Sequence, residues 1–146
     1  METFQVIQVT FWAITALGVW LTWQTFNANR KIKRAEWLKS LYEKFYENDQ
    51  YKTVRRWIDF DTLTSELQHD GSHEKEEKLS DFLNFFEFIA TLEKMKQLSV
   101  TEIQDLFSYY LTRIRSSEPC MNYLQIYEFR NLEKLLYKSF TSVKKN

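Results

Sequence analysis

The two histidines of the chain, His69 and His73, stand four residues apart, and their spacing comes nearest to a metal-binding pattern. Acidic residues surround them, Glu74 among them. A catalytic zinc helix needs two ligands held rigidly on one face and a third ligand from elsewhere in the fold. Gly71 interrupts any helix between the two histidines, so we expect a solvated loop and no metal site.

Other catalytic patterns are missing from the sequence. It holds no Ser/His/Asp arrangement, no glycine-rich phosphate loop and no dinucleotide fingerprint. The single cysteine, Cys120, has no second thiol with which to form an internal disulfide. We therefore expect a protein that is not an enzyme and that uses no cofactor.

Cationic and aromatic side chains in two further segments are the remaining candidates for ligand binding. Arginine forks and aromatic faces together suit a phosphate-bearing nucleotide. The candidate ligand residues are Lys52, Arg55, Arg56, Trp57, Arg113 and Arg115. The alternative role for each of them is that of a solvated or ion-paired residue on the outer face of a helix. A further alternative is a charge pair across a helix interface, in which Glu87 or Asp81 pairs with Arg55 or Arg56.

The composition indicates that helices position these side chains. The chain of 146 residues has two glycines and one proline, and 17% of its residues are aromatic. This combination is typical of all-α proteins and leaves few turn residues for a sandwich or barrel. The formal net charge is zero, so no global charge favours nucleic acid, and we expect no sequence-specific nucleic-acid binding.

Apolar residues at helical spacing predict a compact bundle of about four to five helices over residues 29–146. The central core helix is expected at about 75–97, after a polar loop at 67–76. Ser99 and Glu102 have the spacing of a capping box, and Pro119 suits the first turn of a last helix that runs to about residue 140. No glycine or proline stands between Gly18 and Gly71, so the first helix is expected to continue into this domain.

The N-terminal stretch, residues 4–26, carries no charge over about 23 positions. At about 1.5 Å per residue it is long enough to cross a hydrocarbon layer of roughly 30 Å. We predict a transmembrane helix over residues 1–28. Basic residues follow the span and one acid precedes it, so the positive-inside rule places the N-terminus outside and residues 29–146 in the cytoplasm, with the anchor in the inner (plasma) membrane. The expected membrane-interface residues are Trp20, Trp23, Arg30, Lys31, Lys33 and Arg34.

Polar and small residues of the span fall within one side of the helix. Amide and hydroxyl groups in hydrocarbon gain by bonding to neighbouring helices, and small residues four apart allow close approach. This stripe, with Trp12 on the same side, consists of Gln5, Gln8, Trp12, Thr15, Gly18, Thr22 and Thr25. It predicts a homo-oligomer in which the stripe either packs against partner helices or lines a pore. A third reading makes the segment a buried helix of a soluble oligomer.

Two stretches carry a resemblance: LYEKFYENDQYKTVRRWIDFD, residues 41–61, and LSDFLNFFEFIATLEKMKQLSVTEIQDLF, residues 79–107. They resemble a family of small bacterial proteins with one N-terminal span and a helical domain with a DFLNFFE-like motif. The chain is also similar in build to membrane effectors of bacterial anti-phage systems. That similarity implies oligomerisation and perturbation of the inner membrane on activation by a partner enzyme or its nucleotide messenger.

From these features we expect an oligomeric inner-membrane effector. Its span would form a channel or pore, gated by a nucleotide messenger or a partner protein sensed by the helical domain, in a role such as antiviral defence. The alternative is a non-catalytic anchor or adaptor that holds a partner enzyme at the membrane.

Overall fold

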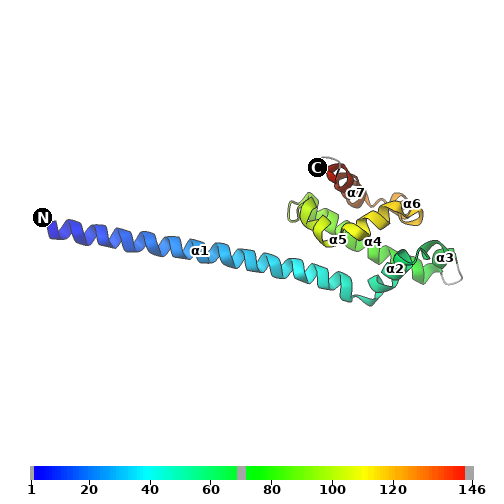
Figure 1. The fold of residues 1–146 in the computed structure, drawn as a ribbon, viewed down its shortest axis with the longest axis horizontal. Coiled ribbons are helices and arrows are strands. Elements are labelled where there is room, and N and C mark those ends of the chain that lie inside the picture. The colour runs from blue at the N-terminus through cyan, green and yellow to red at the C-terminus, as the bar shows by residue number, and fades with distance from the viewer. Residues whose placement is uncertain (1, 69–71, 144–146) are drawn as a thin grey trace. The chain divides into compact units, whose positions relative to one another are not determined.

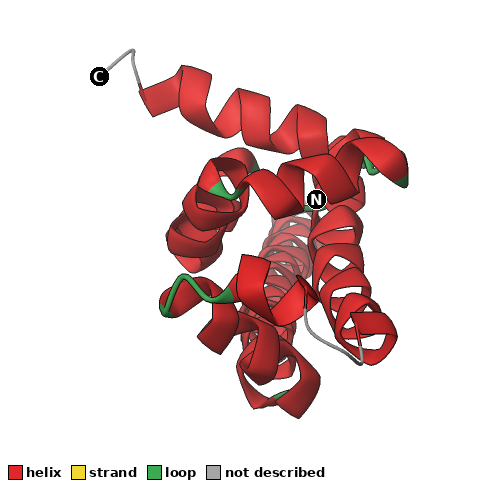
Figure 2. Ribbon diagram, turned by 90° about the vertical axis from the view of Figure 1, so that its right-hand side faces the viewer, coloured by secondary structure: helices red, strands yellow, loops and turns green. Residues whose placement is uncertain are grey.

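The computed structural model describes residues 2–68 and 72–143, without the side chains of 2–7, 9–11, 13–14, 72 and 140–143. Every regular element in these ranges is a helix, as predicted (Figures 1 and 2). The helices are α1 (Glu2–Glu47), α2 (Asp49–Asp59), α3 (Leu63–Gln68), α4 (Ser72–Lys94), α5 (Val100–Ser116), α6 (Glu118–Ile126) and α7 (Arg130–Val143).

The chain divides into two compact units, Met1–Glu43 and Lys44–Asn146. The first unit is formed by α1, and the last turn of the same helix belongs to the second unit. The prediction that the first helix runs unbroken past residue 28 is therefore confirmed. The predicted boundary at residue 28 marks a membrane edge and stays a prediction.

The second unit is built around α4, which packs against α2, α3 and α7, while α5 packs against α6 and α7. The apolar stripe predicted for the central helix is buried throughout, from Leu79 to Ala90. An aromatic cluster fills the middle of this core around Phe45, whose side chain is 0% exposed. The rings within about 6 Å of Phe45 are Tyr46, Tyr51, Phe82, Phe85, Phe86, Phe107 and Tyr110.

Local capping explains where several helices begin. The Asn48 side chain accepts hydrogen bonds from the backbone amides of Gln50 at 2.9 Å and Tyr51 at 3.4 Å, so a new helix starts directly after α1 ends. The capping box between Ser99 and Glu102 is present at the start of α5. The capping box follows the sequence-based expectation.

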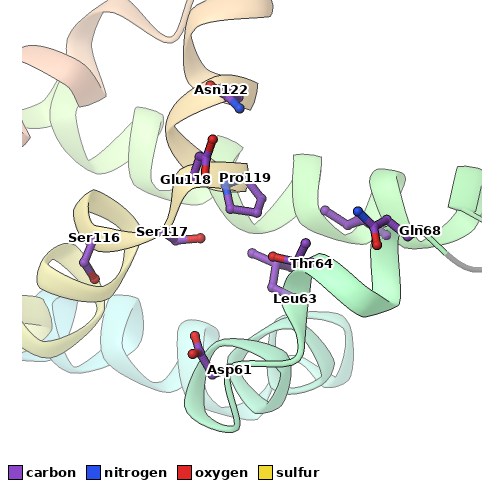
Figure 3. Close-up of a pocket in the computed structure, with 10 residues that line it drawn as sticks. Asp61, Leu63, Thr64, Gln68, Ser116, Ser117, Glu118, Pro119 and Asn122 are labelled. Carbon is purple, nitrogen blue, oxygen red and sulfur yellow. The ribbon is translucent and has the colours of Figure 1, made fainter.

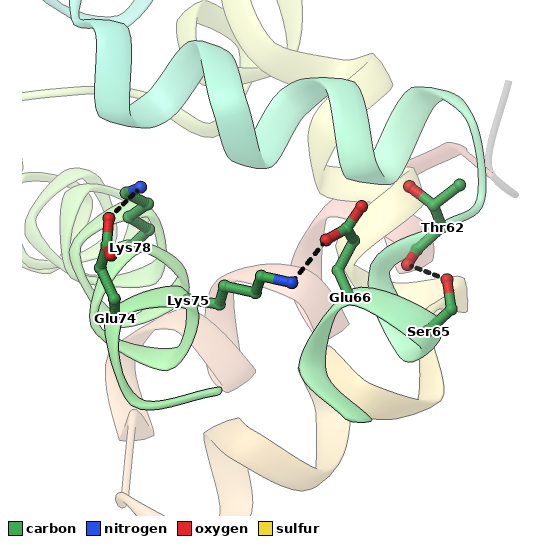
Figure 4. Close-up of polar contacts among 6 residues, drawn as sticks. All are labelled: Thr62, Ser65, Glu66, Glu74, Lys75 and Lys78. Atoms are coloured by element: carbon green, nitrogen blue, oxygen red, sulfur yellow. Dashed lines mark hydrogen bonds and ion pairs between the residues drawn. The ribbon is translucent and has the colours of Figure 1, made fainter. Parts of the chain in front are cut away.

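The polar segment that was predicted as a loop over 67–76 is mostly helical. Residues 67 and 68 belong to α3, and α4 begins at Ser72, three residues before the predicted start. Local charge supports this longer helix, since Glu74 in the first turn complements the helix dipole and pairs with Lys78 at 2.6 Å (Figure 4). His73 therefore lies on a helix, and His69 lies outside the described residues.

The predicted last helix is divided into α6 and α7. Pro119 stands in the first turn of α6, as expected, but the chain leaves the helix at Tyr127 and passes through Glu128 at a φ of 56°. No glycine or proline marks this break. At the break, the Tyr127 side chain is 57% exposed, while Phe129 is buried.

Before Thr15, the structure describes the side chains of Gln8 and Trp12 alone. Among the residues that it describes, no helix is long and apolar enough to cross a membrane.

Candidate functional site

The polar stripe of α1 is exposed wherever its side chains are described, and Gln5 lies outside them. The Thr22 hydroxyl donates to the Gly18 carbonyl at 2.8 Å, and the Thr25 hydroxyl donates to the Leu21 carbonyl at 2.9 Å. Such bonds to the preceding turn satisfy a hydroxyl within its own helix. The hydroxyl donors of these two threonines are therefore satisfied within α1, and the expected packing of the stripe against partner helices stays a prediction.

A groove of about 540 Å³ runs along one face of α1. Three exposed tryptophan rings border smaller residues at intervals of three and four, which places them on one side of the helix. The lining residues are Trp12, Thr15, Ala16, Val19, Trp20 and Trp23. Of the predicted stripe, Trp12 and Thr15 thus belong to an aromatic groove that the sequence analysis did not separate from the polar residues.

Four predicted interface cations follow this groove along α1. They line a cleft of about 570 Å³, and we call the set Asn27, Arg30, Lys31, Lys33 and Arg34 the basic patch. The Arg30 guanidinium lies 5.7 Å from the centre of the Phe26 ring, in a cation–π contact. The structure thus brings the predicted interface cations together on one short stretch of helix.

The candidate ligand residue Arg55 is buried and has a structural role. Its guanidinium donates to the carbonyl oxygens of Phe45 at 2.6 Å and Tyr46 at 2.9 Å, and it lies over both rings at 5.0 and 4.8 Å. These carbonyls belong to the last turn of α1, which has no intrahelical donors for them. Arg55 therefore stabilises a helix end and is not available to a ligand or to Glu87.

Arg113 stabilises the C-terminal end of α2 in the same way. Its guanidinium donates to the Ile58 carbonyl and lies 3.8 Å from the Asp61 carboxylate. Its Nε atom is buried with no partner among the described residues. Two of the six predicted ligand residues are thus used within the fold, because helix C-termini attract cations as phosphates do.

Two other predicted ligand residues, Arg56 and Trp57, line one cleft of about 380 Å³ on α2, which we call the Arg56 cleft. Its remaining lining residues are Thr53, Phe60, Thr62 and Glu66. The Glu66 carboxylate is paired with the Lys75 ammonium at 2.8 Å, which offsets its charge (Figure 4). Lys52 lies one turn before Arg56 on the same helix, whereas Arg115 is exposed on α5.

Another cleft, of about 530 Å³, lies between α3 and the turn that joins α5 to α6 (Figure 3). Its charged groups are the carboxylates of Asp61 and Glu118, and hydroxyls and amides make up most of the rest. No cation is among the residues that line it. The residues that line this cleft offer no cation to a phosphate-bearing ligand, so the Arg56 cleft is the better candidate.

Glu87 is a residue whose role the sequence analysis missed. Its carboxylate accepts hydrogen bonds from the backbone amides of Asn131 at 3.2 Å and Leu132 at 2.7 Å, and from the Asn131 side-chain amide at 2.8 Å. These are orphan donors in the first turn of α7, and a carboxylate there also complements the helix dipole. The predicted charge pair between Glu87 and Arg55 is therefore wrong.

We expect Glu87→Gln to lower the free energy of unfolding by about 1–3 kcal/mol. The amide side chain carries no charge, and its NH2 group cannot bond to the backbone amides of α7, because these are donors too. Urea unfolding measures this change, and hydrogen exchange at Asn131 and Leu132 should become faster. Glu93→Gln is the matched control, since Glu93 also joins α4 to α7 but bonds to the exposed Lys138 ammonium at 3.0 Å. Equal effects of the two variants would contradict the capping role.

Tyr110 makes the stability of the second unit depend on pH in the alkaline range. Burial, followed by the Asp59 charge, raises the pKa of its phenol from 10.0 to about 12. The folded state thus holds the proton more tightly than the unfolded state, so this stability is complete below pH 10 and is lost as pH rises toward 12. Relative to the urea midpoint of Tyr110→Phe, the urea midpoint of the parent protein should therefore fall as the pH rises above 10. A difference that stays constant from pH 8 upward would contradict this.

Reactive groups are sparse in the described chain. Burial raises the pKa of the Cys120 thiol to about 11, which leaves little thiolate at neutral pH. Within residues 2–68 and 72–143, no group of three His, Cys, Asp or Glu side chains could hold a metal ion.

Comparison with family models, curated proteins and solved structures found no match for the chain. The family resemblance drawn from the motif DFLNFFE therefore stays a prediction.

Proposed function

We propose that the chain is an oligomeric effector of the inner membrane, anchored by the N-terminal part of α1 and controlled through its helical domain. One observation carries the proposal. A charge-free stretch with exposed tryptophans continues, within one helix, through the basic patch to Phe45 in the core of the second unit. This order of an apolar segment, aromatic rings and cations is typical of a single membrane span with a cytoplasmic domain.

Self-association of the span would explain why α1 presents exposed tryptophans beside small residues. A single span that presents tryptophans beside small residues can pack closely with copies of itself. Gln8 and Thr15 lie exposed on this segment. In an oligomer they would face either a neighbouring helix or a channel, and we place the working part of the effector there.

The Arg56 cleft supports the proposed sensing role. An exposed guanidinium next to the rings of Trp57 and Phe60 suits a ligand that carries both a phosphate and an aromatic base. A nucleotide messenger of a defence system has this chemistry. A partner protein that presents an acidic and apolar segment would use the same groups.

Membrane extraction and leakage from vesicles test the proposal. The full chain should resist carbonate extraction from bacterial membranes, and its recovery in the soluble fraction would contradict the anchor. Reconstituted in vesicles loaded with carboxyfluorescein, it should release the dye. For a channel, Gln8→Leu and Thr15→Leu should reduce the leakage several-fold, whereas Leu17→Val on the apolar side should not.

A non-conducting adaptor is the second candidate, and the bonds of Thr22 and Thr25 to their own helix favour it, since hydroxyls satisfied in this way require no water-filled lumen. An adaptor would hold a partner enzyme through exposed aromatic rings of its domain, such as Phe60 and Tyr109. Replacement of residues 1–28 by an unrelated membrane helix separates the two functions. An adaptor should keep its activity in cells after this exchange, and a channel should lose it.

A further inference from the structure

The basic patch of α1 gathers positive charge on one short stretch of helix, and the nearest acidic residue in the sequence is Glu36, which follows it. Four of its five members are cations, and no aspartate or glutamate stands between residues 3 and 35. The four cations are exposed. A surface of this kind attracts phosphate groups, and it does so without any need for a particular protein fold.

The arrangement of the patch suits phosphate oxygens. Asn27, Arg30 and Arg34 recur at intervals of three and four, so they share one face of the helix. The two lysines flank this face, and together the five side chains line the cleft of about 570 Å³. The Phe26 ring supports the Arg30 guanidinium through the cation–π contact at 5.7 Å. Forked guanidinium donors and an amide thus border one open space.

The position of the patch along α1 identifies the source of the phosphate. If Phe26 marks the edge of the hydrocarbon layer, the twenty residues before it cover about 30 Å. Arg30 then lies about 6 Å beyond that edge, within a headgroup region that is roughly 5–8 Å thick on each side. Trp20 and Trp23, both more than half exposed, precede the patch where aromatic belts are found.

We infer that the basic patch binds the phosphate groups of anionic phospholipids, so that the anchor prefers an acidic leaflet. The inference rests on the membrane anchoring proposed above and adds the class of lipid. A zwitterionic headgroup carries its own ammonium, which repels the patch cations, whereas phosphatidylglycerol leaves its phosphate charge uncompensated.

Quenching of tryptophan fluorescence by brominated lipids tests this preference. The full chain is reconstituted in phosphatidylcholine vesicles that contain either brominated phosphatidylglycerol or brominated phosphatidylcholine. Contact with the anionic lipid should be favoured by at least about fivefold, since each cation near the surface contributes up to about that factor. The preference should disappear, with a ratio of about one, in the variant that combines Arg30→Gln, Lys31→Gln, Lys33→Gln and Arg34→Gln.

A matched variant removes the same charge from elsewhere in the chain and should keep the preference. It consists of Lys44→Gln, Lys94→Gln, Lys96→Gln and Lys134→Gln, all at exposed positions. A parent protein that enters vesicles and resists carbonate without lipid preference overturns the inference and leaves the anchor standing. Failure to enter vesicles overturns both. Patch-dependent binding of a single-stranded DNA probe, with no preference for phosphatidylglycerol, assigns the patch to nucleic acid and also overturns the inference.

Discussion

Phe45→Ala is expected to lower the free energy of unfolding of the second unit by about 3–5 kcal/mol. The Phe45 side chain is fully buried, and its ring contacts rings from α2, α4 and α5, with centroid distances of 5.1 Å to Phe85 and 5.3 Å to Phe107. Truncation removes these contacts and leaves a cavity that rigid aromatic neighbours fill poorly. Since small domains are stable by roughly 5–15 kcal/mol, this loss is a large part of the total.

Urea unfolding of the full chain in detergent, followed by circular dichroism, measures the effect. Phe60→Ala is the matched control, because the Phe60 side chain is 72% exposed and its truncation should change stability by less than about 0.5 kcal/mol. If Phe45→Ala prevents folding, Phe45→Leu should show a smaller loss of about 1–2 kcal/mol. Equal stability of the Phe45 and Phe60 variants would contradict the central position of Phe45.

Arg55→Met is expected to lower the free energy of unfolding by about 2–4 kcal/mol. The substitution keeps much of the side-chain volume but removes both donors, so the carbonyl groups of Phe45 and Tyr46 lose their partners at the end of α1. Arg55→Lys should recover part of the loss, because an ammonium group restores the charge at the helix C-terminus but cannot form the same fork.

The neighbouring residue supplies the control. Arg56→Met changes the same residue type one position along α2, on an exposed side chain, and should alter stability by less than about 0.5 kcal/mol. If Arg55 instead served a ligand, as the sequence analysis considered, its loss would leave urea unfolding unchanged and weaken binding alone. The two outcomes separate a structural from a ligand-binding arginine.

Local signals predicted those parts of the fold that depend on neighbours in the sequence. The start of α5 follows from Ser99 and Glu102, three residues apart, whose side chains and backbone amides satisfy each other. The burial of the α4 stripe follows from the spacing of apolar residues such as Phe82 and Phe86. Neither inference needs any knowledge of which helix lies opposite.

The candidate ligand site was predicted less well, because an arginine has the same chemistry whether it meets a phosphate or a helix end. Arg55 and Arg113 bind backbone carbonyls at the ends of α1 and α2, while Arg56 lines a cleft. The sequence shows the guanidinium groups but not which carbonyls lie within their reach. That depends on how the helices pack.

By itself, the sequence determined the helical class, the unbroken first helix and the order of apolar stretch, aromatic rings and cations along it, since all of these depend on composition and on residues within a few turns. Only the tertiary structure decided where the last helix divides. The backbone amides of Asn131 and Leu132 bond to the carboxylate of Glu87, more than forty positions earlier in the chain. A contact over that separation leaves no local pattern, so the break between α6 and α7 could be read only from the packed helices.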